Sequence, residues 1–289
     1  MRKTLLILSL LLGAGPARAA RLERVEELGP VRIHGKAAMM LGPWTARSLE
    51  FDKPVALRSL RVELRDGSGR PVRDLSNLCH VTFSYSRSLP SDEPWQIATV
   101  DATTPRFAFP DGYGFILVPG QRYALNAMAY SDSAAVDREL RFVVVLELED
   151  DPAGAGIRPL RLAQVGIRAK DAGLPGYTGP HDWLVPPGRH EYAHEGPAPF
   201  SGRLFVIAPH LHPHVAGYRL EEPGGRRLLD VKIAGKTAGG LARPGDTVWA
   251  DPAGVPVDAG KRYRWTVVYD NTTDHPIPVM ASFLSFYAP

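Results

Sequence analysis

Two histidines, His210 and His212, are separated by a single leucine and followed at the same spacing by a third, His214. Side chains two residues apart on a β-strand point to the same face, so an H-x-H pair in a strand can place both imidazoles on one metal ion. Among the nine histidines of this chain, about 0.3 such pairs and about 0.01 such triplets are expected by chance. Spacing alone therefore leaves a metal site and an ordinary pair of histidines both open.

A thioether near the C-terminus, Met280, suggests which metal the histidine pair would hold. Methionine is a soft ligand that binds Cu(I), whereas zinc and iron prefer other donors. The apolar residues 204–207 supply a strand leading into the histidines, and the apolar run that contains Met280 predicts a second strand. A copper site formed by His210, His212 and Met280 and carried by two strands is one interpretation of this pattern, with His214 in its second shell or on the surface. Histidines and a methionine that bind no metal are the other.

The other histidines favour simpler interpretations. His190 and His194 would share one face of a helix, and residues 190–194 (H-E-Y-A-H) have the spacing of the zincin motif H-E-x-x-H. Flanking proline and glycine favour a strand, in which residues four apart also share a face but lie about 13 Å apart. A zinc protease is therefore not expected. We expect His275 to lie in a loop.

The N-terminus predicts export. Arg2 and Lys3 precede an apolar run over residues 4–12, and Ala17-Arg18-Ala19 fits the small-x-small rule for cleavage, so residues 1–19 are expected to be a signal peptide. The protein is then secreted or periplasmic. No later segment reaches the about 18 apolar residues of a membrane span.

The leader also accounts for the basic charge balance. Three of the 34 basic residues and none of the 31 acidic residues lie in it, which leaves a mature chain with equal numbers of each. Charge therefore gives no support for nucleic-acid binding. The single cysteine, Cys79, excludes an intramolecular disulfide, and its thiol is either buried or a reactive or metal-binding group.

Short runs of β-branched and aromatic residues recur between turns rich in Gly, Pro and Asp, which predicts an all-β protein. The residues 150–156 form the best boundary, so we expect two tandem antiparallel β-sandwiches, jelly-roll-like, over residues 20–150 and 151–289. Strands are predicted over residues 57–64, 80–85, 114–118, 123–130, 141–148, 158–168, 188–193, 202–209, 216–221, 228–233, 247–250, 262–270 and 278–287.

The second half resembles the copper type II, ascorbate-dependent monooxygenases, the family of peptidylglycine alpha-hydroxylating monooxygenase and dopamine beta-monooxygenase. Residues 185–188 (V-P-P-G) resemble the family segment before the metal motif. Residues 209–219 (P-H-L-H-P-H-V-A-G-Y-R) are similar to its H-T-H and G-Y-R segments, and residues 279–287 stand where the family carries its methionine ligand. The resemblance spans residues 157–289 and implies copper at His210, His212 and Met280.

The first half is a fainter match, and it departs from the family at the second, electron-transfer copper. The resemblance implies three imidazoles there, but their positions hold Cys79, His80 and Ala129. Cys79 and His80 remain a candidate site for Cu(I), which tolerates low coordination and favours thiolate. The alternative is that Cys79 is a small buried residue and His80 a core histidine.

Substrate-binding positions of the family differ as well. The arginine that grips a peptide carboxylate in the amidating enzymes precedes the first metal histidine by two residues, and here that residue is Ala208. Ser282 and Leu284 replace two polar residues that follow the methionine ligand. Alanine cannot replace a bidentate arginine, so peptide amidation is not expected.

Two functions stay open. In one, the chain is an exported monooxygenase-like enzyme with one copper ion that hydroxylates a C–H bond of an unknown substrate, with electrons from ascorbate, another reductant or a partner protein. In the other, it is a non-catalytic copper-binding protein of the envelope, for storage, delivery or sensing. The sequence identifies no catalytic residue besides the metal ligands.

Overall fold

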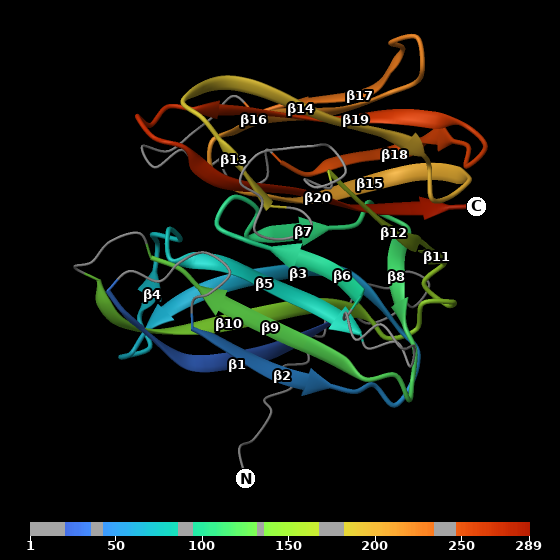
Figure 1. The fold of residues 1–289 in the computed structure, drawn as a ribbon. Helices are drawn as coiled ribbons and strands as arrows, with labels where there is room; N and C mark the ends of the chain where they lie inside the picture. Colours follow the sequence, from blue (N-terminus) through green and yellow to red (C-terminus); the bar gives the residue numbers. More distant parts are fainter. Residues whose placement is uncertain (1–20, 36–42, 86–94, 132–135, 168–181, 234–246) are drawn as a thin grey trace. The chain divides into compact units, whose positions relative to one another are not determined.

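The computed structural model describes residues 21–35, 43–85, 95–131, 136–167, 182–233 and 247–289, and over these residues it contains strands and no helix. The chain divides into two compact units, residues 1–160 and residues 161–289. Each unit is an antiparallel β-sandwich of the jelly-roll type, described here by itself (Figure 1). The predicted signal peptide lies outside the described residues.

In the first unit, one sheet has the strand order β1-β10-β3-β8-β11, with β4 and β7 paired to β3, and the other has the order β2-β9-β5-β6. All pairings are antiparallel except that of β11 with β8. The strands are β1 (Arg21–His34), β2 (Trp44–Leu49), β3 (Val55–Asp66), β4 (Pro71–Val72), β5 (Leu78–Tyr85), β6 (Trp95–Val100), β7 (Arg106–Ala108), β8 (Tyr113–Leu117), β9 (Tyr123–Ala129), β10 (Asp137–Glu149) and β11 (Arg158–Pro159).

In the second unit, one sheet has the order β12-β20-β15-β18, with β13 also on β20, and the other has the order β14-β19-β16-β17. In Figure 1 the second of these sheets forms the upper layer of the unit. The strands are β12 (Arg161–Gly166), β13 (Asp182–Val185), β14 (Gly188–Pro197), β15 (Gly202–Leu211), β16 (Val215–Glu221), β17 (Arg227–Lys232), β18 (Trp249–Val257), β19 (Arg262–Asn271) and β20 (Ile277–Ala288).

The side chains between these two sheets form a buried apolar core that includes Trp183, Tyr218, Tyr269 and Phe283. On β20 the core residues are Val279, Ala281 and Phe283, in the two-residue alternation of a strand. Residues between them therefore point to the other face of the sheet. This parity decides where Met280 lies.

The boundary between the units falls after Leu160, ten residues beyond the predicted boundary after Asp150. The predicted linker folds as a compact turn, in which the Asp151 carbonyl accepts from the Ala155 amide and the Asp151 carboxylate accepts from the Gly154 amide. After the turn, Arg158 pairs with β8 and its guanidinium lies over the Tyr113 ring. These contacts keep residues up to Leu160 with the first unit.

Each predicted strand overlaps an observed strand. The predicted strand 158–168 is divided into β11 and β12, with residue 168 outside the described residues, and the predicted strand 247–250 shares only its last two residues with β18. The strands missed are mainly sheet edges or short pieces: β1, β2, β4, β6, β7 and β13. The β1 sequence carries many charges on its exposed face, which hides its alternation. The described residues include no helix long and apolar enough to cross a membrane.

Candidate metal centre

The pairing of β15 with β20 brings the predicted ligands together. His210 pairs with Ser282 and Leu211 with Ala281, so the same register continued by one residue sets Met280 opposite His212. Leu211 and Ala281 face the core, and His210 and Ser282 therefore face the other side of the sheet. Directly opposed Cβ atoms lie about 5 Å apart and diagonal neighbours about 7–8 Å apart, so this register places Met280 directly opposite His212 and diagonal to His210.

The two imidazoles are buried and close. His210 is 8% exposed, His212 is 4% exposed, and their ring centroids are 5.5 Å apart at an interplanar angle of 83°. Nδ1 of His212 lies 3.3 Å from the Pro278 carbonyl oxygen, which can only accept, so Nδ1 carries the hydrogen. In the neutral ring this leaves Nε2, itself buried, as the nitrogen with the lone pair. Metal-binding histidines are commonly oriented by such a bond.

Strand β19 fixes both ends of this arrangement. The Tyr269 hydroxyl, buried in the core, donates to the Met280 carbonyl, and the next residue, Asp270, donates its amide to the His214 carbonyl at 2.8 Å. Nδ1 of His214 also lies 3.3 Å from the Thr272 hydroxyl. His214 adopts a φ of 70° in the turn that joins β15 to β16. It is therefore held by the end of β19, and its second-shell role stays a prediction.

The sheet surface beside the histidines is mostly apolar. Ala208, two residues before His210 on the same face, pairs with Leu284, and both are 1% exposed. Ser282 is the polar exception, and its hydroxyl accepts a hydrogen bond of 3.1 Å from the Gln164 amide. Ala208 and Leu284 offer no charged or polar side-chain group that could bind a carboxylate.

Cys79 and His80, the candidates for a second site, are adjacent on β5, and Cys79 Sγ lies 3.3 Å from His80 Nδ1. Cys79 is 8% exposed and His80 is partly buried. Ala129, where the resemblance places a third imidazole, is fully buried. Within the described residues, no group of three or more His, Cys, Asp and Glu side chains could hold a metal ion. The set of His210 and His212 therefore depends on Met280 for its third ligand.

Three other histidines of the described residues, His190, His194 and His275, lie outside these two sets. His190 and His194 lie in β14, a strand, as predicted, so they are not arranged as on a zincin helix. His190 Nε2 contacts the Pro187 carbonyl oxygen at 3.0 Å. His275 lies in the connection between β19 and β20 and contacts the Asp274 carboxylate.

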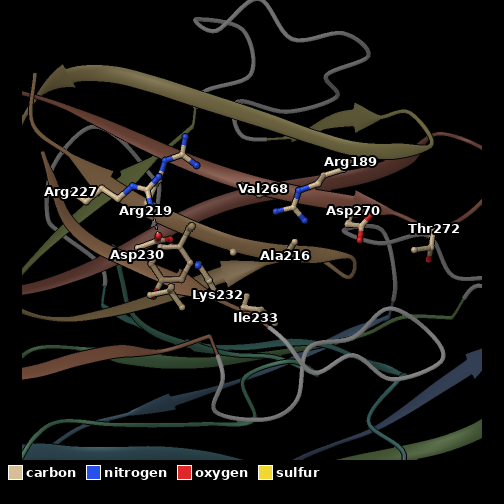
Figure 2. A pocket seen from close by; sticks show the side chains of 13 residues that line it. Arg189, Ala216, Arg219, Arg227, Asp230, Lys232, Ile233, Val268, Asp270 and Thr272 are labelled. Carbon is tan, nitrogen blue, oxygen red and sulfur yellow. Dashed lines mark hydrogen bonds and ion pairs between the residues drawn. The ribbon is translucent and has the colours of Figure 1, made fainter. Parts of the chain in front are cut away.

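A hollow of about 800 Å³ lies elsewhere in the second unit, on the face of the β14-β19-β16-β17 sheet that points away from the core. Gly217 and Val268 are among the residues that line it, and Figure 2 shows Arg189, Asp270 and Thr272 along one part of it. None of the predicted copper ligands lines it. The hollow and the histidine pair belong to different sheets of one sandwich.

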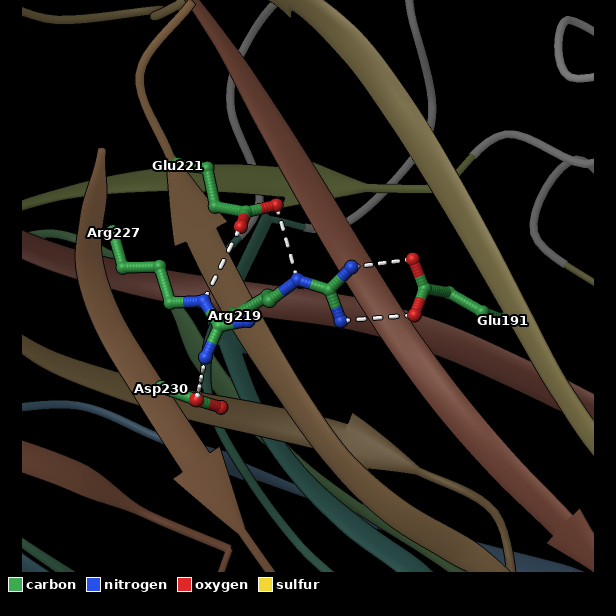
Figure 3. Close-up of polar contacts among 5 residues, drawn as sticks. All are labelled: Glu191, Arg219, Glu221, Arg227 and Asp230. Carbon is green, nitrogen blue, oxygen red and sulfur yellow. Dashed lines mark hydrogen bonds and ion pairs between the residues drawn. The ribbon is translucent and has the colours of Figure 1, made fainter. Parts of the chain in front are cut away.

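Arg219 beside this hollow is held by two carboxylates (Figure 3). Its guanidinium donates to both oxygens of Glu191 and, at 3.0 Å, to Glu221. Hydrogen bonding to Arg219 lowers the pKa of Glu191, and the same bond to Glu191 raises the pKa of Arg219. Arg227 extends the network to Asp230 at 2.8 Å. The charge of the Arg219 guanidinium is thus balanced by Glu191 and Glu221, so Arg219 does not offer the hollow a cation for binding an anion.

The sequence analysis missed Met128, which pairs with His80 across β5 and β9. The alternation of β9 was readable in the sequence and gives Met128 the face opposite to Ala129. The supporting contacts of Pro278 and Tyr269 had no signal in the sequence, because both depend on register.

Comparison with known proteins finds no matching family model and no matching curated protein. Among solved structures, N-glycanase F (PNGase F) is similar over 91% of this chain and 96% of its own, with a TM-score of 0.43 and 8% identity. PBCV-1 VP54, fitted into a reconstruction of the virophage Sputnik, is similar over 97% and 98%, with a TM-score of 0.31 and 7% identity. At these values neither likeness bears on what this chain does.

Proposed function

We propose that this chain is an exported, copper-binding member of the copper type II, ascorbate-dependent monooxygenase family, with one copper ion at His210, His212 and Met280. The register of β15 against β20 carries the proposal, because it makes neighbours of two histidines and a methionine that lie about 70 residues apart in sequence.

The side chains present fit copper by their chemistry. Two imidazoles suit several transition metals, and the added thioether favours Cu(I). The bond from His212 Nδ1 to the Pro278 carbonyl fixes the tautomer that offers Nε2. The burial of both rings keeps bulk water from the nitrogens. The ligand side chains are thus largely in position before a metal binds, because they are carried by the strands of a rigid sandwich.

A bound copper ion would supply the one-electron chemistry with which this family uses O₂ to hydroxylate a C–H bond. The chain's own contribution is to hold and orient the imidazoles and to place an apolar surface, Ala208 and Leu284, beside them. Ascorbate, another reductant or a partner protein would supply electrons.

A non-catalytic role in copper storage, delivery or sensing is the second candidate. It is favoured by Ala129, which is fully buried where the resemblance places an imidazole of the electron-transfer centre. Without that imidazole the family's two-centre electron supply is incomplete.

The test is an anaerobic Cu(I) titration of the mature protein against a competing chelator. Relative to the unaltered protein, the double variant His210→Ala/His212→Ala should bind one equivalent less. Met280→Leu keeps the side-chain volume and should weaken that equivalent by about tenfold or more, since even groups that only orient ligands alter metal affinity by 10–100-fold. His194→Ala, a strand histidine of the same unit, is the matched control and should change nothing.

Unchanged stoichiometry and affinity in both Met280→Leu and the double variant would overturn the copper site. If the double variant fails to fold, the methionine variant still decides. Oxygen uptake by copper-loaded protein with ascorbate then separates the two candidates: uptake that needs His210 and His212 supports the enzyme, and its absence supports the binding protein.

A further inference from the structure

Strand β5 contains a β-bulge at Cys79. Leu78 pairs with Ala129 and His80 with Met128, so two steps along β5 oppose one step along β9, and Cys79 is the extra residue. In a regular strand Cys79 and His80 would point to opposite faces. The bulge resets the alternation and turns both to one side, as the 3.3 Å contact between Sγ and Nδ1 shows.

Met128 joins them from the neighbouring strand. As the direct partner of His80 it shares that residue's face, while the neighbouring pair Val81 and Ala127 is fully buried on the other. Trp44 of β2 pairs with Met128 in turn and is 66% exposed. One row across three strands thus carries an indole, a thioether, an imidazole and a thiol.

This row does not fit the three-imidazole centre that the family resemblance implies. Ala129 points with Leu78 to the opposite, buried face, so a side chain there could not reach His80. The donors present are one nitrogen and two sulfurs. Sulfur donors shift the preference from Cu(II) to Cu(I) and away from magnesium, calcium and manganese.

We propose that Cys79, His80 and Met128 form a separate Cu(I) site in the first sandwich. Binding deprotonates the Cys79 thiol, releases that proton to solvent and changes no oxidation state when Cu(I) is the ion supplied. The site retains copper in its reduced form, in place of a centre that alternates between two oxidation states. It stands on the register of β5 and β9 and does not depend on the site at His210.

The test adds Cu(I), presented as a weak chelator complex without oxygen, to the mature protein carrying His210→Ala and His212→Ala. This background removes the other site. One equivalent should still bind and should quench the fluorescence of Trp44, identified by the loss of quenching in Trp44→Phe. Cys79→Ser should lower the Cu(I) affinity by about 100-fold or more, and Met128→Leu should lower it by about tenfold. For comparison, mutation of a residue that only orients a metal ligand typically lowers the affinity by about 10–100-fold.

His34→Ala is the matched control, because His34 is an exposed strand histidine of the same unit, and it should leave binding unchanged. X-ray absorption of the bound copper should show sulfur neighbours that decrease in Cys79→Ser. Binding unaffected by both Cys79→Ser and Met128→Leu, or copper with nitrogen and oxygen neighbours alone, would overturn the proposal. Because the background already lacks the second-unit histidines, neither result depends on whether the proposed function holds.

Discussion

The first sandwich has the sheet orders β1-β10-β3-β8 and β2-β9-β5-β6, and the second has β12-β20-β15-β18 and β14-β19-β16-β17. Strand for strand, these are the same path, with β12 and β13 together taking the place of β1 along β20. The equivalent strands β9 and β19 also begin with the same sequence, Gly-x-Arg-Tyr. In each, the tyrosine hydroxyl, of Tyr123 or Tyr263, accepts a hydrogen bond from the backbone amide of the residue five positions earlier.

The equivalent positions differ in chemistry. Strands β5 and β16 carry a bulge at the same place, and where the first unit has Cys79 and His80, the second has Ala216 and Gly217. Met128 corresponds to Val268. The first unit fills the position with soft donors, and the second leaves a hollow. The bulge therefore belongs to the fold, and only the residues placed on it indicate a metal.

The reverse holds on the other sheet. Both β3 and β15 shift register once against their partner, and counting from that shift aligns His210 with Glu63 and His212 with Arg65. Met280 then corresponds to Arg141, which is ion-paired with Glu27 at 2.8 Å. The shared topology thus offers two positions for a metal site, and the two proposed sites use different ones: β5 and β9 in the first unit, and β15 and β20 in the second.

The largest expected effect is on the free energy of unfolding and comes from a comparison of two single-residue deletions, Leu211 between the two histidines and Cys79 on the bulge. Removal of Leu211 makes His210 and His212 consecutive, so one imidazole must turn into the apolar core, and a buried leucine is lost. We expect a loss of more than about 3 kcal/mol in the free energy of unfolding of the second unit.

Removal of Cys79 should cost less than about 1 kcal/mol, because it deletes the bulge residue and keeps the pairs Leu78–Ala129 and His80–Met128. Urea unfolding of both deletions checks the contrast, with Cys79→Ala as control for the side chain alone. Equal costs would show that the register difference between the two donor sets is not what organises them.

A medium effect is expected for Gly217→Ala. Gly217 has a φ of 157°, and a Cβ there would lie 2.4 Å from the Val231 carbonyl oxygen, although its counterpart His80 carries a full side chain. We expect a loss of about 2 kcal/mol in thermal or urea unfolding. Gly224→Ala, at a φ of 94° with open space around its Cβ, should cost about half as much. An unchanged free energy of unfolding in Gly217→Ala would mean that the backbone at Gly217 tolerates a side chain, and that the backbone is not the reason for the hollow there.

The smallest effect concerns Glu191, which stands where the first unit has Trp44. Because Arg219 holds the pKa of Glu191 below its ordinary value of 4.5, the ionised carboxylate is favoured in the folded state. Glu191→Gln should cost about 1 kcal/mol at pH 7, a modest figure because the carboxylate is 44% exposed.

That contribution is present above pH 4.5 and is lost as the pH falls through the lowered pKa of folded Glu191. The unfolding curves of the two proteins should therefore converge in acid. Glu222→Gln removes a pair whose arginine, Arg226, is 67% exposed where Arg219 is 17% exposed, so it should change stability less. A difference that grows as the pH falls would contradict the network.

Strand prediction from the sequence worked where both faces of a strand are buried or cleanly alternate, as in β10, β15 and β20. It failed on edges such as β2, whose exposed face gives no apolar signal. It also ended β18 too early, because Asp251, Pro252 and Gly254 are turn-forming types, yet the strand continues through them to Val257.

The sequence by itself determined that His210 and His212 share a face, since alternation along a strand is a local property of the backbone. Whether Met280 lies beside them depends on the register of β15 against β20, which is a property of the tertiary structure. Only the tertiary structure decided that Cys79 and His80 meet, and that Met128 stands beside them. A bulge and its register are set by pairing with another strand, and that pairing is not written in the neighbouring residues.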